Sequence, residues 1–380
     1  MRVYSMVRPK KLSQIPEAMA RAERLGYDGT TLLELTVPPT LSAAAGAMLT
    51  KDVKMMSGVF VAFPRSPMAT AYDAWSLNEL SGGRFQLGIG SQIKAHLTRR
   101  FGMDFQPPIR RMKDYINALN AIWDCWQNGT KLDYDGVYYK HNLMIPYYNP
   151  GPLATGKPEV HLAAINKLMC RLCGEVAQGH LPGDPITWKW HEEVMLPNLE
   201  IGLERSGRTL KDLDLGGYGF IGCANNTADL DKVAKGLKER VALYASTPEY
   251  KEMLSMHGFK VTQEDFAALT RENKWEEMGE LVSDDMLEAY AVITTPEDLP
   301  AALAKRYGGK IDRIQIDETW FEGLSDDQVA KLTKAELVEN TGKDENGHQC
   351  KGCAGKGSNG KVPYFGVFVV DFAILSKVYV

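Results

Sequence analysis

The sequence has little of what secreted, membrane-spanning or nucleic-acid-binding proteins need. Only six cysteines occur in 380 residues, which favours reduced thiols over a disulfide framework. The first residues show no signal-peptide core, and no early apolar run reaches the ~20 residues that span a bilayer. The net charge is −4, so no basic surface for nucleic acid is indicated. We therefore expect a cytoplasmic protein that acts on a small molecule, with no membrane or nucleic-acid partner.

Several common catalytic motifs are also missing. The chain contains no phosphate-binding Walker loop, no Gly-x-Ser-x-Gly elbow and no His-Glu-x-x-His pair, each of which marks a distinct chemistry. His348, Cys350 and Cys353 have part of a metal-ligand spacing. A structural zinc site normally needs four ligands, so we expect no metal.

Strand-like and helix-like segments alternate along most of the chain. This alternation is typical of a parallel sheet covered by helices. Counting one weak strand gives eight, and the sequence therefore predicts an α/β fold, an eight-stranded (β/α)8 TIM barrel. The expected strands are 2–7, 29–33, 53–62, 85–90, 159–164, 180–181, 213–223 and 313–317. The expected helices are 13–25, 41–49, 68–80, a long one that starts at 107 and runs through 126, 168–177, 190–206, 229–244 and 326–338, with a further polar, helical segment at 261–286.

Two segments do not follow this alternation. Residues 128–158 are rich in Tyr, Asn, Pro and Gly, and we expect an insertion on the barrel rim in which residues 136–139 form one arm of a hairpin. The barrel is predicted to span residues 1–339. Residues 340–380 form an atypical tail, first rich in Gly, Lys and Cys and then apolar, to which we assign no function.

Residues 81–92, Ser-Gly-Gly-Arg-Phe-Gln-Leu-Gly-Ile-Gly-Ser-Gln, combine a tight turn, a buried strand and a polar loop. A barrel places its chemistry at the carboxyl ends of its strands. His96 follows this loop and is a candidate catalytic residue, because histidine exchanges protons near neutral pH; a structural histidine on the rim is the alternative. Glu34 ends the second strand and is the other catalytic candidate, although it would serve equally to bond a backbone amide or an arginine.

Several motifs, taken together in their order and spacing, resemble the bacterial luciferase-like superfamily and, within it, the branch that depends on the deazaflavin coenzyme F420. The resemblance covers about residues 2–338. It implies an eight-stranded β/α barrel, a reduced flavin mononucleotide (FMN) or F420 bound over the carboxyl ends of the strands, and a homodimer. The motifs lie at residues 65–67, 81–85, 87–92, 95–96, 99–102 and 241–248.

The resemblance also implies which residues hold the cofactor. Gly58 and Val59 match the family's non-proline cis peptide, which supports the cofactor ring. Gly90, Ser91 and Gln92 match a cofactor-contacting loop. The phosphate-receiving stretch, usually Gly-Pro-Lys/Arg, is here Ile165, Asn166 and Lys167.

The chain departs from the family pattern at positions that bear on the chemistry. An Asp/Glu-His pair often follows the second strand in deazaflavin enzymes, but the stretch here is Glu34-Leu35-Thr36, and an acid found after the fourth strand of some relatives falls at Ile93. We expect an oxidoreductase that transfers a hydride between F420 and a small organic substrate. An FMN-dependent monooxygenase that uses oxygen and a non-catalytic cofactor-binding barrel are the alternatives.

Overall fold

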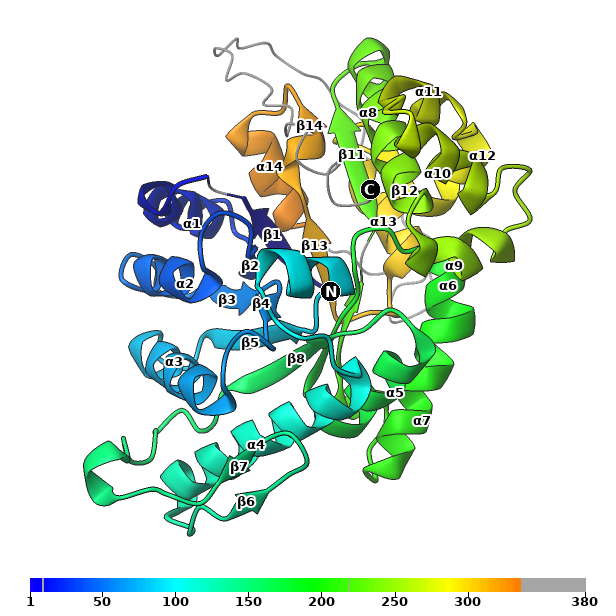
Figure 1. Cartoon of the computed structure of the whole chain (residues 1–380). Helices are drawn as coiled ribbons and strands as arrows, with labels where there is room; N and C mark the ends of the chain where they lie inside the picture. Colours follow the sequence, from blue (N-terminus) through cyan, green and yellow to red (C-terminus); the bar gives the residue numbers. More distant parts are fainter. Residues whose placement is uncertain (9, 218, 336–380) are drawn as a thin grey trace, which may run out of the picture.

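A computed structural model describes residues 1–8, 10–217 and 219–335 of the chain. The predicted tail of residues 340–380, with its His348–Cys353 motif, lies outside the described residues. Figure 1 shows a ring of strands with α1 (Ile15–Arg24), α2 (Pro39–Ala47) and α3 (Pro67–Leu80) side by side along one flank.

The ring is a closed barrel of eight parallel strands, as the alternation predicted. β3 pairs with β5 on one side, and β1 pairs with β13 through Arg2 and Arg313, so the barrel has no open edge. The eight strands are β1 (Arg2–Val7), β2 (Gly29–Leu32), β3 (Lys54–Ser57), β5 (Phe85–Gly90), β8 (Glu159–Ala163), β9 (Gly179–Leu181), β10 (Asp214–Gly217) and β13 (Arg313–Ile316).

Two of the predicted strands are each divided. The strand expected at 53–62 is interrupted after Ser57, and β4 (Phe60–Val61) resumes beside β5. The strand expected at 213–223 ends at Gly217, and β11 (Phe220–Ala224) instead joins a second parallel sheet. That small sheet also contains β12 (Ala291–Thr294) and β14 (Phe321–Glu322), which the sequence reasoning did not identify.

The outer layer consists of helices whose ends follow local sequence signals. Ser66 caps α3 by accepting a hydrogen bond from the amide of Ala69, and Gly129 ends α4 (Pro108–Asn128) with a φ of 67°, a conformation that favours glycine. The other long helices are α5 (Lys167–Val176), α7 (Leu196–Arg205), α8 (Thr227–Ala245), α13 (Leu299–Tyr307) and α14 (Asp326–Thr333), and α10 (Gln263–Arg271) and α11 (Trp275–Glu280) pack against α8.

Arg84, at the turn before β5, ties neighbouring segments together. Its guanidinium donates to the carbonyls of Ser81, Thr50 and Val53 at 2.8–2.9 Å and to the hydroxyl of Thr50 at 3.0 Å. Charge-assisted bonds of this kind are among the stronger hydrogen bonds in proteins. The Ser-Gly-Gly-Arg-Phe stretch therefore anchors the entrance of β5 to the loop that precedes β3, and its role at this end of the strand is structural.

The 128–158 segment lies outside the barrel against α4, as expected (Figure 1). Its hairpin pairs β6 (Tyr134–Asp135) with β7 (Lys140–His141). Residues 136–139 form the turn, so their assignment to a hairpin arm was wrong. The buried carboxylate of Asp114 on α4 accepts the hydroxyl of Tyr134 and the amides of Tyr138 and Tyr139, and these bonds hold the hairpin on the helix.

Candidate active site at the barrel mouth

The residues predicted to hold a cofactor come together at one end of the barrel. Gly58 and Val59 lie between β3 and β4, Gly90 ends β5, and residues 165–167 join β8 to α5. Because these neighbouring strands are parallel, their carboxyl ends share one edge of the sheet. A Cβ built on Gly90 would lie 2.9 Å from Val59 Cγ2 and 3.3 Å from Ala163 Cβ, so these three residues form one close-packed surface.

The peptide bond between Gly58 and Val59 is cis, as the family resemblance implied. A Cβ on Gly58 would lie only 2.2 Å from Thr31 Cγ2, so the contact with β2 requires glycine here. Gly90 itself has no positive φ; within the predicted cofactor-contacting loop that conformation occurs at Gln92, with a φ of 62°. A non-glycine residue held there is unusual and is often found near functional sites.

His96 begins a five-residue π-helix, η2 (His96–Arg100), which follows the β5 loop. Short π-helical turns are frequent at functional sites. The side chain is half-buried, and burial, with a smaller contribution from Arg100, lowers the pKa of His96 below its usual value. Its imidazole is therefore neutral at neutral pH. Arg100 also donates to the carbonyl of Leu35 at 3.1 Å, which joins this turn to the loop after β2.

Glu34 is almost fully engaged by protein groups. Its side chain is 8% exposed. One carboxylate oxygen accepts the amide of Val61 at 2.7 Å, and the two oxygens accept two guanidinium nitrogens of Arg65 at 2.8 and 3.1 Å. Arg65 also donates to the Val61 carbonyl at 3.0 Å. The Glu34–Arg65 pair holds β4 in place directly after the cis peptide. Bonding a backbone amide and an arginine is the structural alternative that the sequence left open for Glu34.

The amino terminus of α5 faces the same edge of the barrel. Asn166 is the N-cap residue but makes no side-chain capping bond, so the amides of the first turn keep their capacity to bind an anion. The ammonium of Lys167 pairs with Glu252, and the carbonyl of Ile165 accepts the indole N–H of Trp190 at 3.1 Å. These contacts fix the loop on both sides of Asn166.

Sequence reasoning missed a Cys-x-x-Cys pair within α5, although the spacing was readable. Cys170 and Cys173 are both fully buried. Burial raises the pKa of Cys170 to about 12 and that of Cys173 well above its usual value. Thiols in this state are inert, because the thiolate is the reactive form. Among the residues that the structure describes, no group of His, Cys, Asp or Glu is placed to hold a metal ion.

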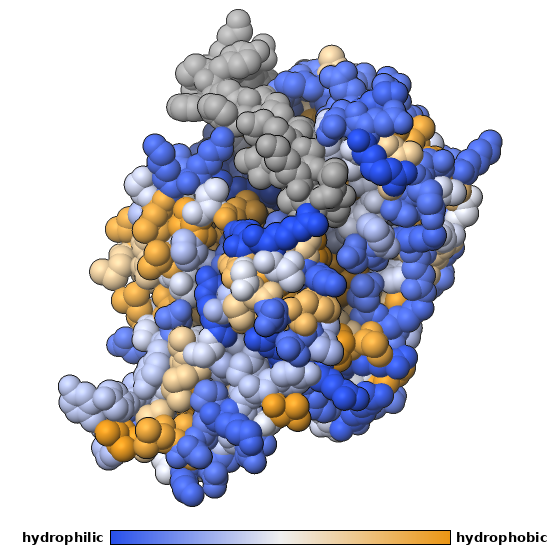
Figure 2. Space-filling model, in the orientation of Figure 1, coloured by the Kyte–Doolittle hydropathy of each residue, from blue (hydrophilic) through white to orange (hydrophobic). Residues whose placement is uncertain are grey.

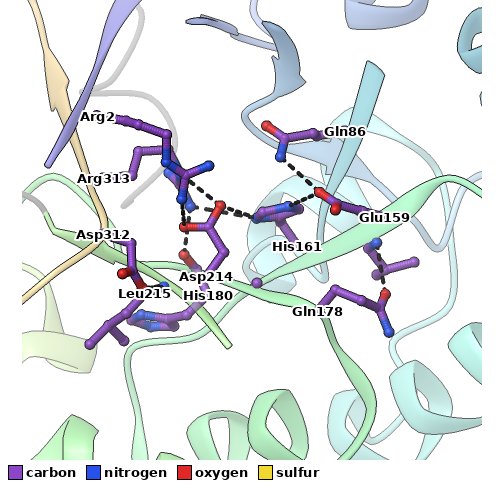
Figure 3. A network of polar contacts seen from close by, with 12 residues as sticks. Arg2, Gln86, Glu159, His161, Gln178, His180, Asp214, Leu215, Asp312 and Arg313 are labelled. Atoms are coloured by element: carbon purple, nitrogen blue, oxygen red, sulfur yellow. Dashed lines mark hydrogen bonds and ion pairs between the residues drawn. The ribbon is translucent and has the colours of Figure 1, made fainter. Parts of the chain in front are cut away.

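A polar network crosses the opposite end of the barrel (Figure 3). Arg2 donates to Asp214 at 2.8 Å, and Arg313 approaches Nδ1 of the buried His161 at 3.5 Å. Because arginine only donates, His161 carries its hydrogen on Nε2, which faces Glu159 at 3.4 Å. The bond from His161 is the main cause that lowers the pKa of Glu159 to about 2. The network lies where the strands begin, so its role is to tie them together.

A cavity of about 750 Å³ also lies far from the strand ends, between the end of α4 and the 128–158 segment. It is lined by Trp126, Leu132, Leu143 and Met144, among others. It contains none of the predicted site residues. No helix within the described ranges is both long and apolar enough to cross a membrane.

The chain is similar to several known proteins. An uncharacterized protein of Mycobacterium tuberculosis is 35% identical over 306 residues, which cover 80% of this chain and 90% of that protein. The 5,10-methylenetetrahydromethanopterin reductase of Archaeoglobus fulgidus is 26% identical over 262 residues, 67% of this chain and 73% of the enzyme. The coenzyme F420-dependent tetrahydromethanopterin reductase of Methanopyrus kandleri has the same fold, with a TM-score of 0.70 at 20% identity over 88% of this chain and 97% of that structure.

A family model covers nearly the whole described barrel. The model of the luciferase-like monooxygenases matches residues 2–313. This range includes the cis peptide, the β5 loop and the turn before α5, and it ends at the first residue of β13. The eight parallel strands, the site at their carboxyl ends and this match together show that the chain belongs to the luciferase-like monooxygenase family.

Proposed function

We propose that this protein is an oxidoreductase that transfers a hydride between coenzyme F420 and a small organic substrate. The observation that carries the proposal is the surface formed by Val59, Gly90 and Ala163 beside the amino terminus of α5. A close-packed apolar surface next to helix amides that have no side-chain cap fits a planar ring with a phosphate-bearing chain. Relatives named as methylenetetrahydromethanopterin reductases support a reductase, and a relative named as an F420-dependent glucose-6-phosphate dehydrogenase supports the choice of cofactor.

The protein's contribution is to bind, orient and exclude water, because the bound cofactor supplies the hydride chemistry. Gly58, Val59 and the loop 90–92 would hold the ring, and residues 165–167 would receive the phosphate. The neutral imidazole of His96 would accept the substrate proton at its free ring nitrogen. Glu34 was also predicted to be catalytic; its bonds with Arg65 and Val61 support a positioning role, in which it holds β4 beneath the ring.

Replacing Gly90 with valine is expected to weaken cofactor binding at least tenfold. The Cβ of the new side chain alone would lie 2.9 Å from Val59 Cγ2 and 3.3 Å from Ala163 Cβ. Either Val59 and Ala163 must move, or the two methyl groups of the valine must occupy the space proposed for the cofactor ring. The measurement is titration of folded wild type and variant with F420 and with FMN.

Ser42→Ala, a change within α2 on the outside of the barrel, is the control for this titration. Equal affinity of wild type and Gly90→Val for the preferred cofactor would exclude the β5 loop from the site. Preference for FMN together with oxygen consumption would favour the monooxygenase. Binding of either cofactor without turnover of any substrate would favour the non-catalytic barrel.

We also propose that the protein forms a homodimer through the flank of α2 and α3. Figure 2 shows apolar residues gathered over this flank, at the left of the view. The exposed side chains there include Leu41, Met48, Leu49 and Leu80, and Met48 is 70% exposed. Contiguous apolar surface of this kind usually marks an interface.

We expect analytical sedimentation of the wild type to show a dimer. The double variant Leu41→Glu with Met48→Glu is expected to be a monomer. A wild-type monomer at micromolar concentration would contradict this.

A further inference from the structure

A small polar cavity lies at the same end of the barrel as the candidate active site but is formed by other strands. It is enclosed by the segments that follow β1, β9, β10 and β13. Its volume is about 10 Å³, which is enough for one water-sized oxygen atom. The residues around it include Met6, Arg8, Asp184, Gln315, Asp317 and Trp320.

The amide of Gln315 is the unexplained group in this cavity. The side chain is only 2% exposed. Its Nε2 has no hydrogen-bond partner among the residues that the structure describes. A buried donor without an acceptor costs about 1–3 kcal/mol, and most such groups in proteins are satisfied. The Nε2 of Gln315 can therefore donate a hydrogen bond to an acceptor atom placed in the cavity.

The charged groups around the cavity are already paired. Arg8 lies 2.7 Å from Asp317 and 3.6 Å from Asp184. Asp184 is also 3.7 Å from Arg240 and accepts the hydroxyl of Tyr244 at 3.3 Å. An anion placed here would face the carboxylates of Asp184 and Asp317, and a cation would face the guanidinium of Arg8, so either would meet a like charge at short range. The surroundings favour a group without net charge.

We propose that this cavity binds a neutral oxygen of the substrate, a hydroxyl or a carbonyl, which accepts a hydrogen bond from Gln315 Nε2. The inference rests on the proposed function, since it names the substrate class of that oxidoreductase: a neutral organic molecule with an apolar body and such an oxygen. Met6 and Trp320 supply the apolar contacts. The partly exposed Arg8, Asp184 and Asp317 form the entrance of the cavity.

The test uses three probes of one shape and different charge: cyclohexanol, cyclohexanecarboxylate and cyclohexylammonium. Their binding to the full-length protein is measured by NMR titration, first without cofactor and then with F420. We expect cyclohexanol to bind at least tenfold more tightly than either charged probe. Gln315→Leu should remove at least tenfold of the cyclohexanol affinity, as expected for one lost hydrogen bond to a buried group. Gln127→Leu, which changes a glutamine that bonds Leu153 on the outer segment, should change nothing.

Gln315→Met provides a second variant that keeps the length of the side chain and removes the donor, and we expect the same loss of cyclohexanol affinity. Unchanged cyclohexanol affinity in a folded Gln315 variant, or tighter binding of a charged probe to the wild type, would overturn the proposal. The measurement without cofactor separates this inference from the proposed function. If F420 does not bind, the oxidoreductase proposal fails while the probe result still decides the role of the cavity.

Discussion

His96→Ala is expected to lower the rate of hydride exchange between bound cofactor and substrate by about 10²–10⁴-fold, the usual contribution of a general acid–base group. The position of His96 supports this, since it follows the β5 loop and starts the π-helix η2. Burial lowers its pKa, so the imidazole is ready to accept a proton at neutral pH. In the direction of substrate oxidation, the wild-type rate should stay constant above about pH 6.5 and fall in acid as the imidazole becomes protonated.

The measurement is single-turnover reduction of the bound cofactor by substrate across about pH 5.5–8.5, with cofactor affinity measured in parallel. The affinity for the cofactor should hardly change, because the surface that contains Val59 and Gly90 remains intact. Thr98→Ala is the matched control, since this residue lies on the same π-helix and its hydroxyl bonds only the Lys94 carbonyl. A His96→Ala rate within about threefold of wild type, less than ~1 kcal/mol of barrier, would refute the catalytic role and direct attention to Glu34.

Mild acid is expected to destabilise the fold strongly, with a loss of about 4–5 kcal/mol in unfolding free energy between about pH 7.5 and 4.5. Two buried histidines make the largest contribution. Burial lowers the pKa of His180 to about 4 and that of His191 to about 3. Unfolded, both take up protons near pH 6.5. Stability is therefore complete above that pH and is lost as the pH falls toward the folded-state values. Urea unfolding at a series of pH values measures the effect.

The variant His191→Phe removes one of the two histidines and so tests its share of the pH dependence of stability. The ring of His191 stacks on Trp188 at 4.7 Å, and its Nε2 has no hydrogen-bond partner among the described residues. Phenylalanine can keep the stacking and cannot be protonated. The variant should lose about half as much stability as the wild type between about pH 7.5 and 4.5. An equally steep pH dependence in wild type and variant would rule out His191 as a source of the acid sensitivity.

The sequence sufficed for the barrel because its signals are local. The buried strand Phe85–Gly90 has a large apolar residue at every second position and lies between turn residues. The alternation of such strands with helices leaves few possible topologies. The weak strand at His180 was identified only from its place in the alternation, and the structure contains it as β9. The cis peptide at Gly58 was inferred from the family resemblance and is present, whereas no local pattern marks it.

The remaining features depend on contacts between distant residues. The bond of Glu34 to Arg65 spans 31 positions, and nothing local decides whether that carboxylate faces a substrate or an arginine. The turn at residues 136–139 was taken for a strand because Val137 and two tyrosines suit a strand. The turn conformation is fixed by Asp114 on α4, which accepts the amide of Tyr138. That the side-chain amide of Gln315 lacks a hydrogen-bond partner among the described residues can be recognised only once β13 is placed in the barrel.

The pairing of Arg2 with Arg313, which closes the barrel, has a consequence for synthesis on the ribosome. β1 emerges first, and its partner β13 follows about 310 residues later, which takes about 15–60 s at the usual rates of translation. During that time β1 can pair with β2, but its other edge keeps unpaired amides and carbonyls. Such an edge is open to strands of other nascent chains. The yield of native protein therefore depends on whatever shields the edge of β1 until translation reaches β13.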